Sequence, residues 1–443
     1  MDERLIAYAE RPAPRYTSYP TAPHFSDAVG AENVRAWLGA LPVQSALSLY
    51  IHVPYCRQLC WYCGCNTYAA RRPETVADFV DTLIAEIDLV ALHLDARRLT
   101  EIHWGGGTPN ILSAAEFARI AAHVARRFDI DKAAQHAIEL DPRYVDDEKA
   151  GAYAKASVNR VSLGVQTFDA RVQQAIGRVQ SFETVRDALH SLRRAGISQI
   201  NMDLMYGLPH QNTEDLRESV RLAATLEPDR IALFGYAHVP WFKKRQRLIS
   251  ESTLPNAKER FDQAETAHKA LESLGYVAIG LDHFAKPDDE LAVAQRSGKL
   301  RRSFQGYAIQ EADAIIGVGP SAISTLPQGY AQNASEPGAW ARCVADGQLA
   351  SARGHALTQN DRVRGRLIEQ IMCDFEGDLA PLGGTSGCAE ELALLQSMFA
   401  DGMIELEDDT LLLTDAAHPF CRLIAMAFDA YAQRGLARHS RAV

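Results

Sequence analysis

The sequence has no excess of positive charge and no long apolar run. Its 46 Lys and Arg residues are outnumbered by 56 Asp and Glu residues, giving a net charge of −10 at pH 7, whereas proteins that hold nucleic acid through a bulk positive field carry clustered basic residues. No stretch approaches the roughly 18 apolar residues of a membrane-spanning helix. The N-terminal segment MDERLIAYAERPAPRYTSYP also lacks the apolar core of a signal peptide. We therefore expect a cytoplasmic protein that binds no nucleic acid and has no membrane span.

Cysteine is scarce, and half of it is concentrated in one place. Of the eight cysteines in 443 residues, four lie within ten positions, at Cys56, Cys60, Cys63 and Cys65. A disulfide framework spreads its cysteines along a short secreted chain, so this clustering predicts a metal site instead. The other four cysteines, in the last quarter of the chain, are expected to be small buried side chains.

Short β-rich runs alternate with amphipathic stretches through the middle of the chain. This alternation predicts an α/β fold with a parallel sheet, and six units fit an open or partial (β/α)6 barrel better than a closed eight-stranded one. In either geometry, reactive groups gather at the carboxyl ends of the strands. The strands are expected at 47–53, 99–104, 136–140, 159–164, 199–206 and 230–236, and the helices at 74–93, 113–127, 146–156, 181–195, 212–226 and 256–274.

Two further segments flank this predicted barrel domain, which covers residues 46–350. Residues 1–45 are expected to form an irregular arm, rich in Pro and Tyr, with one short helix near 31–40 and a position over the active site. After residue 350 the composition shifts, and residues 351–443 are predicted to form a small, mainly helical, winged-helix-like C-terminal domain. Its expected elements are helices at 357–376 and 389–401, a hairpin over 402–417 and a last helix at 417–434.

The cysteine run directly follows the first predicted strand. Its spacing is Cys56-x3-Cys60-x2-Cys63, with Cys65 two residues further on. Three thiolates on one loop can hold three corners of a cubane iron–sulfur cluster and leave the fourth iron open to a ligand. The alternative is a zinc site, which prefers paired Cys-x2-Cys halves and four protein ligands. The sequence shows no second half for such a site.

Other polar or glycine-rich positions fall where predicted strands end. Gly105, Gly106 and Gly107 follow the second strand, where glycines let the backbone approach a ligand closely. Glu139 ends the third strand, and its carboxylate can accept hydrogen bonds from ribose hydroxyls. Gln166 and Asp203 also lie at strand ends, which predicts a shared pocket.

The pattern Cys56-x3-Cys60-x2-Cys63 after a strand resembles the signature of radical S-adenosylmethionine (SAM) enzymes. Its extension through Cys65 and Asn66 resembles one family among them, the oxygen-independent coproporphyrinogen III oxidases, also called coproporphyrinogen dehydrogenases. Further motifs agree with that family in the same order over essentially the whole chain: PRYTSYPTA at 14–22, HWGGGTP at 103–109, ELDPR at 139–143, GVQTF at 164–168, MDLMYGLP at 202–209, LDHFAKPDDELAVAQR at 281–296 and GPSAIS at 319–324.

The resemblance implies a partial barrel of the radical SAM type that holds one 4Fe–4S cluster through Cys56, Cys60 and Cys63, and that binds SAM, with two molecules accommodated. It places the first SAM against Tyr50, Gly106, Glu139 and Ile323. For the second it implies Tyr62, Gly107, Thr108, Gln166, Arg178, Asp203 and Ala237.

Two residues beside the predicted cluster are candidates for a catalytic role. Cys65 is not needed by a three-thiolate site, and the family marks it as a distinguishing residue near the cluster. His52 lies next to the cysteine loop, although strand histidines more often serve only to satisfy hydrogen bonds. Both roles stay open at this point.

The implied activity is oxidative decarboxylation of two propionates of coproporphyrinogen III to vinyl groups, which yields protoporphyrinogen IX for haem synthesis through a 5′-deoxyadenosyl radical. An electron donor and an electron acceptor are then required, and the family expectation is a monomer. The alternative is a haem chaperone of the same superfamily that transfers haem without oxidising a porphyrinogen. A purely structural zinc protein is more distant.

Such a substrate raises a question of charge, because it carries four propionates while the chain is net acidic. Its binding requires cations placed locally, since Arg–carboxylate pairs act at short range. The candidates are Arg15, Lys243, Lys244, Arg245, Lys286, Arg296, Arg301 and Arg302.

Overall fold

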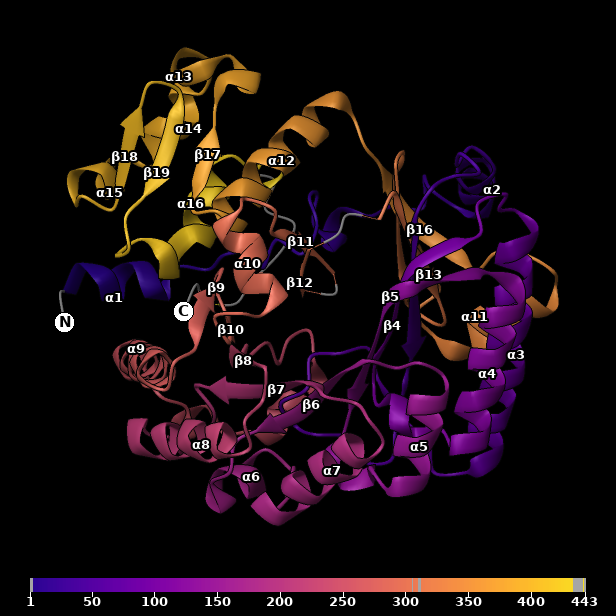
Figure 1. The fold of residues 1–443 in the computed structure, drawn as a ribbon. Coiled ribbons are helices and arrows are strands. Elements are labelled where there is room, and N and C mark those ends of the chain that lie inside the picture. Colours follow the sequence, from indigo (N-terminus) through magenta and orange to yellow (C-terminus); the bar gives the residue numbers. More distant parts are fainter. Residues whose placement is uncertain (1–2, 305, 310–311, 433–440, 442–443) are drawn as a thin grey trace.

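The computed structural model describes residues 3–304, 306–309, 312–432 and 441. Positions 433–434 of the last predicted helix lie outside these residues, as do parts of the predicted arm and C-terminal domain. A large twisted sheet with helices packed against it occupies one side of the molecule, and a smaller unit of helices and short strands occupies the other (Figure 1). No helix within the described part of the chain combines the length and apolar character that crossing a bilayer requires.

The centre of the sheet confirms the predicted partial barrel. Its six strands are all parallel and run in the order β1, β4, β5, β6, β7, β8. The six strands are β1 (Leu47–Val53), β4 (Arg98–Gly106), β5 (Asp129–Leu140), β6 (Arg160–Gln166), β7 (Gln199–Tyr206) and β8 (Arg230–Gly235). The helices that follow them are α3 (Pro73–Leu92), α4 (Ala114–Arg127), α5 (Asp147–Lys155), α6 (Ala170–Ala175), α7 (Phe182–Arg194), α8 (Thr213–Thr225) and α9 (Ala257–Ser273).

Burial explains why these runs form strands of a covered sheet. In β1 every residue except Tyr50 is buried, so both faces of the strand are covered, as is typical of parallel sheets between helices. Leu47, Leu49, Ile51 and Val53 belong to one hydrophobic core that includes Trp104 of β4. The strand ends that carry polar residues therefore stand on a rigid base.

The sheet extends beyond the six predicted strands to twelve. β13 pairs with β1 in parallel, and antiparallel strands continue the sheet from there. On the opposite edge, β10 pairs antiparallel with β8 and with β9. The added elements are β9 (Val277–Ile279), β10 (His283–Ala285), α10 (Glu290–Arg296), β13 (Ala314–Val318), β14 (Ile323–Leu326), β15 (Gly329–Asn333), α11 (Pro337–Ala345) and β16 (Ser351–Ala356). Two small pairs stand apart, β2 (Tyr55–Cys56) with β3 (Tyr68–Ala69), and β11 (Arg301–Ser303) with β12 (Gly306–Ala308).

The last part of the chain has the expected mixture of helices and a hairpin. The predicted hairpin is confirmed, because β18 pairs antiparallel with β19, and β17 adds a third strand that was not predicted. The first predicted helix ends at Cys373, before β17 begins, and the second is divided into two short helices. The elements are α12 (Gln359–Cys373), β17 (Glu376–Asp378), α13 (Gly384–Gly387), α14 (Ala389–Leu394), α15 (Gln396–Ala400), β18 (Ile404–Glu407), β19 (Thr410–Leu413) and α16 (Cys421–Ala427).

The N-terminal segment is more regular than predicted. The helix expected near 31–40 is present as α2 (Ala31–Gly39), but α1 (Glu3–Glu10) was not predicted. Tyr8 of α1 packs against Phe420, and Tyr8, Ala9, Ala13, Tyr16 and Tyr19 belong to one hydrophobic cluster whose other buried members lie between residues 367 and 428. Packing against distant residues, which local sequence does not reveal, therefore stabilises this helix.

Candidate active site

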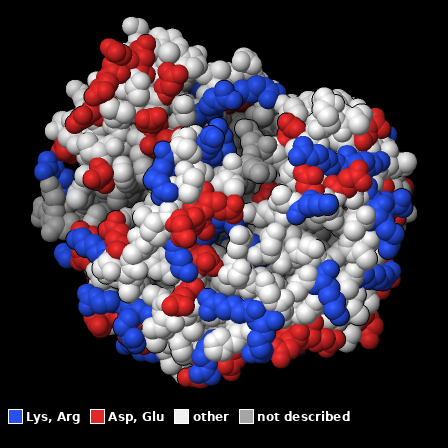
Figure 2. Space-filling view, viewed as in Figure 1, with Lys and Arg blue, Asp and Glu red and all other residues white. Residues whose placement is uncertain are grey.

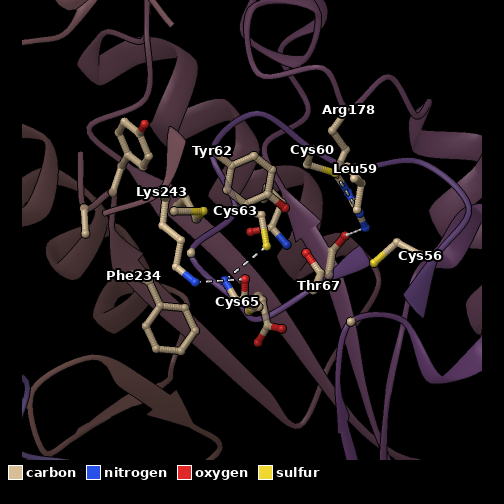
Figure 3. Close-up of a pocket in the computed structure, with 18 of the residues that line it drawn as sticks. Cys56, Leu59, Cys60, Tyr62, Cys63, Cys65, Thr67, Arg178, Phe234 and Lys243 are labelled. Carbon is tan, nitrogen blue, oxygen red and sulfur yellow. Dashed lines mark hydrogen bonds between the residues drawn. The ribbon is translucent and has the colours of Figure 1, made fainter. Parts of the chain in front are cut away.

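A cavity of about 620 Å³ opens at the carboxyl ends of β4 to β8. This position is the one that the barrel geometry predicts for reactive groups. Figure 3 shows the cysteine-loop side chains grouped around it, with Arg178, Phe234 and Lys243. The cavity brings together thirteen of the predicted metal-binding, cofactor-binding and catalytic residues: Cys56, Cys60, Tyr62, Cys63, Cys65, Gly106, Gly107, Thr108, Glu139, Gln166, Arg178, Asp203 and Ala237.

Each of the three predicted ligand sulfurs accepts a hydrogen bond. The Thr108 hydroxyl donates to Cys56 Sγ at 3.2 Å, Arg178 Nη1 to Cys60 Sγ at 3.7 Å, and the Cys65 N–H to Cys63 Sγ at 3.4 Å. Hydrogen bonds to sulfur stabilise thiolates in iron–sulfur sites and tune the cluster's potential. The three hydrogen-bonded sulfurs therefore fit a cluster held by three thiolates.

The placement of the thiols is also informative about the kind of metal site. Within the described residues, no three His, Cys, Asp or Glu side chains converge on one point as ligands of a single ion. In a four-iron cluster each thiolate binds a different iron, so the sulfurs need to face one cavity rather than one point. Hydrogen bonding by Cys65 lowers the pKa of the Cys63 thiol to about 6, whereas burial raises the pKa of Cys56 to about 11.

The glycine run lies directly against the start of the cysteine loop. The Gly107 N–H donates to the Val53 carbonyl at 2.7 Å, and a Cβ at Gly107 would lie 2.8 Å from the Tyr55 carbonyl oxygen. Gly106 has φ +106°, and a Cβ there would lie 2.5 Å from the His52 ring. Glycine is required at both positions because the His52 ring and the strand before the cysteine loop pack directly against this backbone, while its close approach to a ligand stays a prediction.

Glu139 is held by a histidine that the sequence did not single out. His103 Nε2 lies 3.0 Å from Glu139 Oε1. Burial alone would raise the pKa of Glu139, but the hydrogen bond and the charge of His103 outweigh burial and lower it. At neutral pH Glu139 therefore carries a negative charge and can accept hydrogen bonds.

Tyr50, His52 and Ile323 do not line the cavity itself. The Tyr50 hydroxyl lies 3.0 Å from His52 Nδ1, and the other ring nitrogen of His52 lies 3.3 Å from the Asn66 carbonyl oxygen. The Tyr50 ring also stacks on His103, at 5.8 Å between centroids. Tyr50 and His52 thus lie behind Gly106 and Glu139. Ile323 begins β14, on the neighbouring side of the sheet.

A second group of residues comes from the ends of β6, β7 and β8. Gln166 has φ +70°, an unusual conformation for a residue other than glycine, and such strain is concentrated at functional sites. The Asp203 carboxylate accepts hydrogen bonds from Ser162 and Asn201 at 2.9 and 2.7 Å. Burial, followed by the charge of Glu139, raises the pKa of Asp203 to about 6.

Arg178 is fixed in place by a buried carboxylate. Its Nη1 lies 3.0 Å from Asp141 Oδ2, and both side chains are less than a tenth exposed. Arg143 holds the same carboxylate at 2.7 Å. Sequence reasoning did not single out Asp141, although it lies in the ELDPR motif. Gln246 was also missed; its amide donates to the carbonyls of Tyr62 and Ala237 and joins two predicted site residues.

Comparison with known proteins shows the family to which this chain belongs. A model of the radical SAM superfamily matches residues 50–223. The oxygen-independent coproporphyrinogen III oxidase of Bradyrhizobium diazoefficiens is 46% identical over 99% of both chains, and that of Escherichia coli is 37% identical over 97% of this chain and 95% of its own. A solved structure of coproporphyrinogen III oxidase from Escherichia coli, described as a radical SAM enzyme, superposes with a TM-score of 0.91 at 36% identity, over 97% of this chain and 99% of that one.

Proposed function

This chain belongs to the oxygen-independent coproporphyrinogen III oxidases of the radical SAM superfamily, and from that premise we propose that it converts coproporphyrinogen III to protoporphyrinogen IX. In the proposed reaction two of the four propionates each lose one hydrogen atom, one CO2 and one electron and become vinyl groups. The protein is then an oxidoreductase of haem synthesis that works without oxygen.

The observation that carries this proposal is the set of three hydrogen-bonded sulfurs facing one cavity at the ends of parallel strands. Cys56, Cys60 and Cys63 would hold a 4Fe–4S cluster there and leave one iron without a protein ligand. When bound, the reduced cluster and SAM would supply the radical chemistry that removes a hydrogen atom from the β-carbon of a propionate. The chain itself has to position the reactants and exclude water.

Two SAM molecules are proposed, each with its own set of side chains. The first would lie near Gly106 and the ionised carboxylate of Glu139. Tyr50 and Ile323 are proposed as its further contacts. The second would lie among Tyr62, Gly107, Thr108, Gln166, Arg178, Asp203 and Ala237, a set supported by the fact that all seven line the cavity. Asp203 as a carboxylate would accept hydrogen bonds from hydroxyl groups, because its oxygens have room for more than the two donors present.

His52 and Cys65 are proposed as positioning residues. Both ring nitrogens of His52 have neighbours in the protein, the Tyr50 hydroxyl and the Asn66 carbonyl, which supports a role in orienting Tyr50. The Cys65 backbone holds Cys63 Sγ, which supports a role at the cluster loop. The Ala13–Arg15 stretch of the proposed arm, residues 1–45, lines the cavity.

Several properties complete the proposal. Besides the arm, the chain is proposed to have two domains, the barrel domain, residues 46–350, and the C-terminal domain, residues 351–443. The enzyme is proposed to work as a cytoplasmic monomer, with a separate electron donor for the cluster and an acceptor for the electron released with each CO2.

An anaerobic turnover assay tests this function. Protein reconstituted with iron and sulfide is supplied with SAM, a reductant and coproporphyrinogen III, and 5′-deoxyadenosine and vinyl products are measured. We expect both products, their loss in Cys60→Ala and their retention in Cys343→Ala, because Cys343 lies on α11 outside the cavity. Formation of 5′-deoxyadenosine without vinyl product would contradict the proposed reaction and favour the haem chaperone, and haem binding by the same sample would test that alternative.

A further inference from the structure

The side chains that hold the substrate's carboxylates can be sought among the cations of the cavity. Three basic residues line it: Arg15, Arg178 and Lys243. Arg178 is already neutralised by Asp141 at 3.0 Å. The surroundings of Arg15 and Lys243 differ from those of Arg178.

Arg15 and Lys243 are held in place by neutral carbonyl oxygens. Arg15 Nη2 donates to the Gly235 carbonyl at 3.2 Å, and Lys243 Nζ donates to the Cys65 carbonyl at 3.2 Å, as the dashed line in Figure 3 shows for Lys243. Among the described residues neither has a carboxylate within 4.0 Å, whereas Arg143 and Arg178 both do. Most of their N–H donors thus remain available to an incoming anion.

Two of the three acids that line the cavity, in contrast, are already paired with basic side chains. Glu139 is paired with His103, and Asp141 with Arg178 and Arg143. Both acids lie at the end of β5, while Arg15 and Lys243 approach from the arm and from the segment after β8. The third acid, Asp203, is held by the Ser162 hydroxyl and the Asn201 amide. On the β8 side the cavity therefore has two cations that have no carboxylate within 4.0 Å among the described residues.

Two buried arginines lie close enough to Arg15 for its charge to act on them. Arg260 and Arg422 are each less than a tenth exposed. Burial, followed by the charge of Arg15, lowers the pKa of Arg422 to about 10. On the face shown in Figure 2, basic and acidic side chains are intermingled, so attraction of a multiply charged anion depends on such local groupings.

Resting on the proposed function, we infer that Arg15 and Lys243 bind the two propionates of the substrate that are not decarboxylated. A cation paired with a carboxylate stabilises its negative charge and opposes its loss as neutral CO2. The carboxylates that react are therefore best left away from these cations, and the ones that survive are the natural anchors. The other basic residues considered for this role do not line the cavity.

Equilibrium binding of stable porphyrins tests the inference independently of turnover. Coproporphyrin III, protoporphyrin IX and the tetramethyl ester of coproporphyrin III are titrated into the reconstituted protein and into Arg15→Gln, Lys243→Gln and Lys244→Gln. Lys244→Gln is the matched control, because Lys244 is the exposed neighbour of Lys243 and lies outside the cavity. Iron content and circular dichroism establish that each variant is folded and loaded.

We expect Arg15→Gln and Lys243→Gln each to weaken binding of both acids by about 10- to 100-fold. Binding of the ester should be the same in all four proteins. Equal affinity of the two variants and Lys244→Gln for coproporphyrin III would overturn the inference, as would a loss confined to coproporphyrin III, since protoporphyrin IX carries only the surviving propionates. If wild-type protein binds both acids but forms no vinyl product, the proposed reaction fails while the carboxylate site stands.

Discussion

The contact between Gly107 and the strand before the cysteine loop gives the sharpest structural prediction. An alanine Cβ at this position would lie 2.8, 2.9 and 3.0 Å from backbone atoms of Tyr55, Val53 and Pro54. Ordinary contact begins near 3.4 Å, so the two backbone segments would have to separate by about 0.6 Å. The hydrogen bond from the Gly107 N–H to the Val53 carbonyl, 2.7 Å long, opposes that movement.

We expect Gly107→Ala to lower the free energy of unfolding by about 1–3 kcal/mol, the usual cost of overpacking a well-packed site. Because Cys56 follows Tyr55 directly, the displaced segment also carries the first cluster ligand, and iron bound per chain should fall. Unfolding in denaturant followed by circular dichroism, with iron analysis of the reconstituted protein, measures both effects.

Gly64→Ala is the control for this substitution. Gly64 lies in the same cysteine loop, but nothing stands within 4 Å of an added Cβ and its φ is not in the left-handed region. Alanine there should be neutral or should stabilise the protein by up to about 1 kcal/mol, because it restricts the unfolded chain. Equal stability and equal iron content for the two variants would refute the argument from packing.

Three further predictions concern single polar groups. Burial raises the pKa of Glu86 to about 7, so the folded protein binds a proton that the unfolded chain releases. The free energy of unfolding should therefore fall by about 3 kcal/mol as the pH rises from 4.5 to 7. Unfolding curves of Glu86→Gln should lack this dependence on pH. Thr108→Val removes the donor to Cys56 Sγ, so the cluster's reduction potential should become more negative in a redox titration, while Thr108→Ser should keep the wild-type value. With the pKa of Asp203 raised to about 6, SAM affinity should increase about tenfold as the pH rises through 6, and an equally steep increase in Asp203→Asn would exclude this carboxylate.

The sequence predicted the six central strands because their burial pattern is local. The apolar run of β1 and the alternation with amphipathic helices are visible without any knowledge of pairing. Strands β13 to β16 escaped prediction, since each is short and is defined by its partners rather than by its own composition. Helix α1 escaped for the same reason, because its stabilising contacts lie near residue 420.

For the candidate site, spacing and position predicted the residues with distinctive chemistry. Three cysteines on one loop and acids at strand ends are recognisable from the chain alone. Asp141, His103 and Gln246 were missed because they act by holding other residues, and such pairing is visible only in three dimensions. Tyr50 and Ile323 rested on family resemblance, and their roles remain predictions.

The docking of the N-terminal segment has a consequence for the order of events during synthesis. The Tyr16 hydroxyl donates to Asp429, the Tyr19 hydroxyl accepts from the Ala430 N–H, and both rings pack among residues 367–428. A growing chain lacks these partners until residues up to Ala430 have left the ribosome. Residues 13–19 therefore find these partners late, and the part of the cavity wall formed by Ala13, Pro14 and Arg15 is completed only after the cysteine loop has long been made.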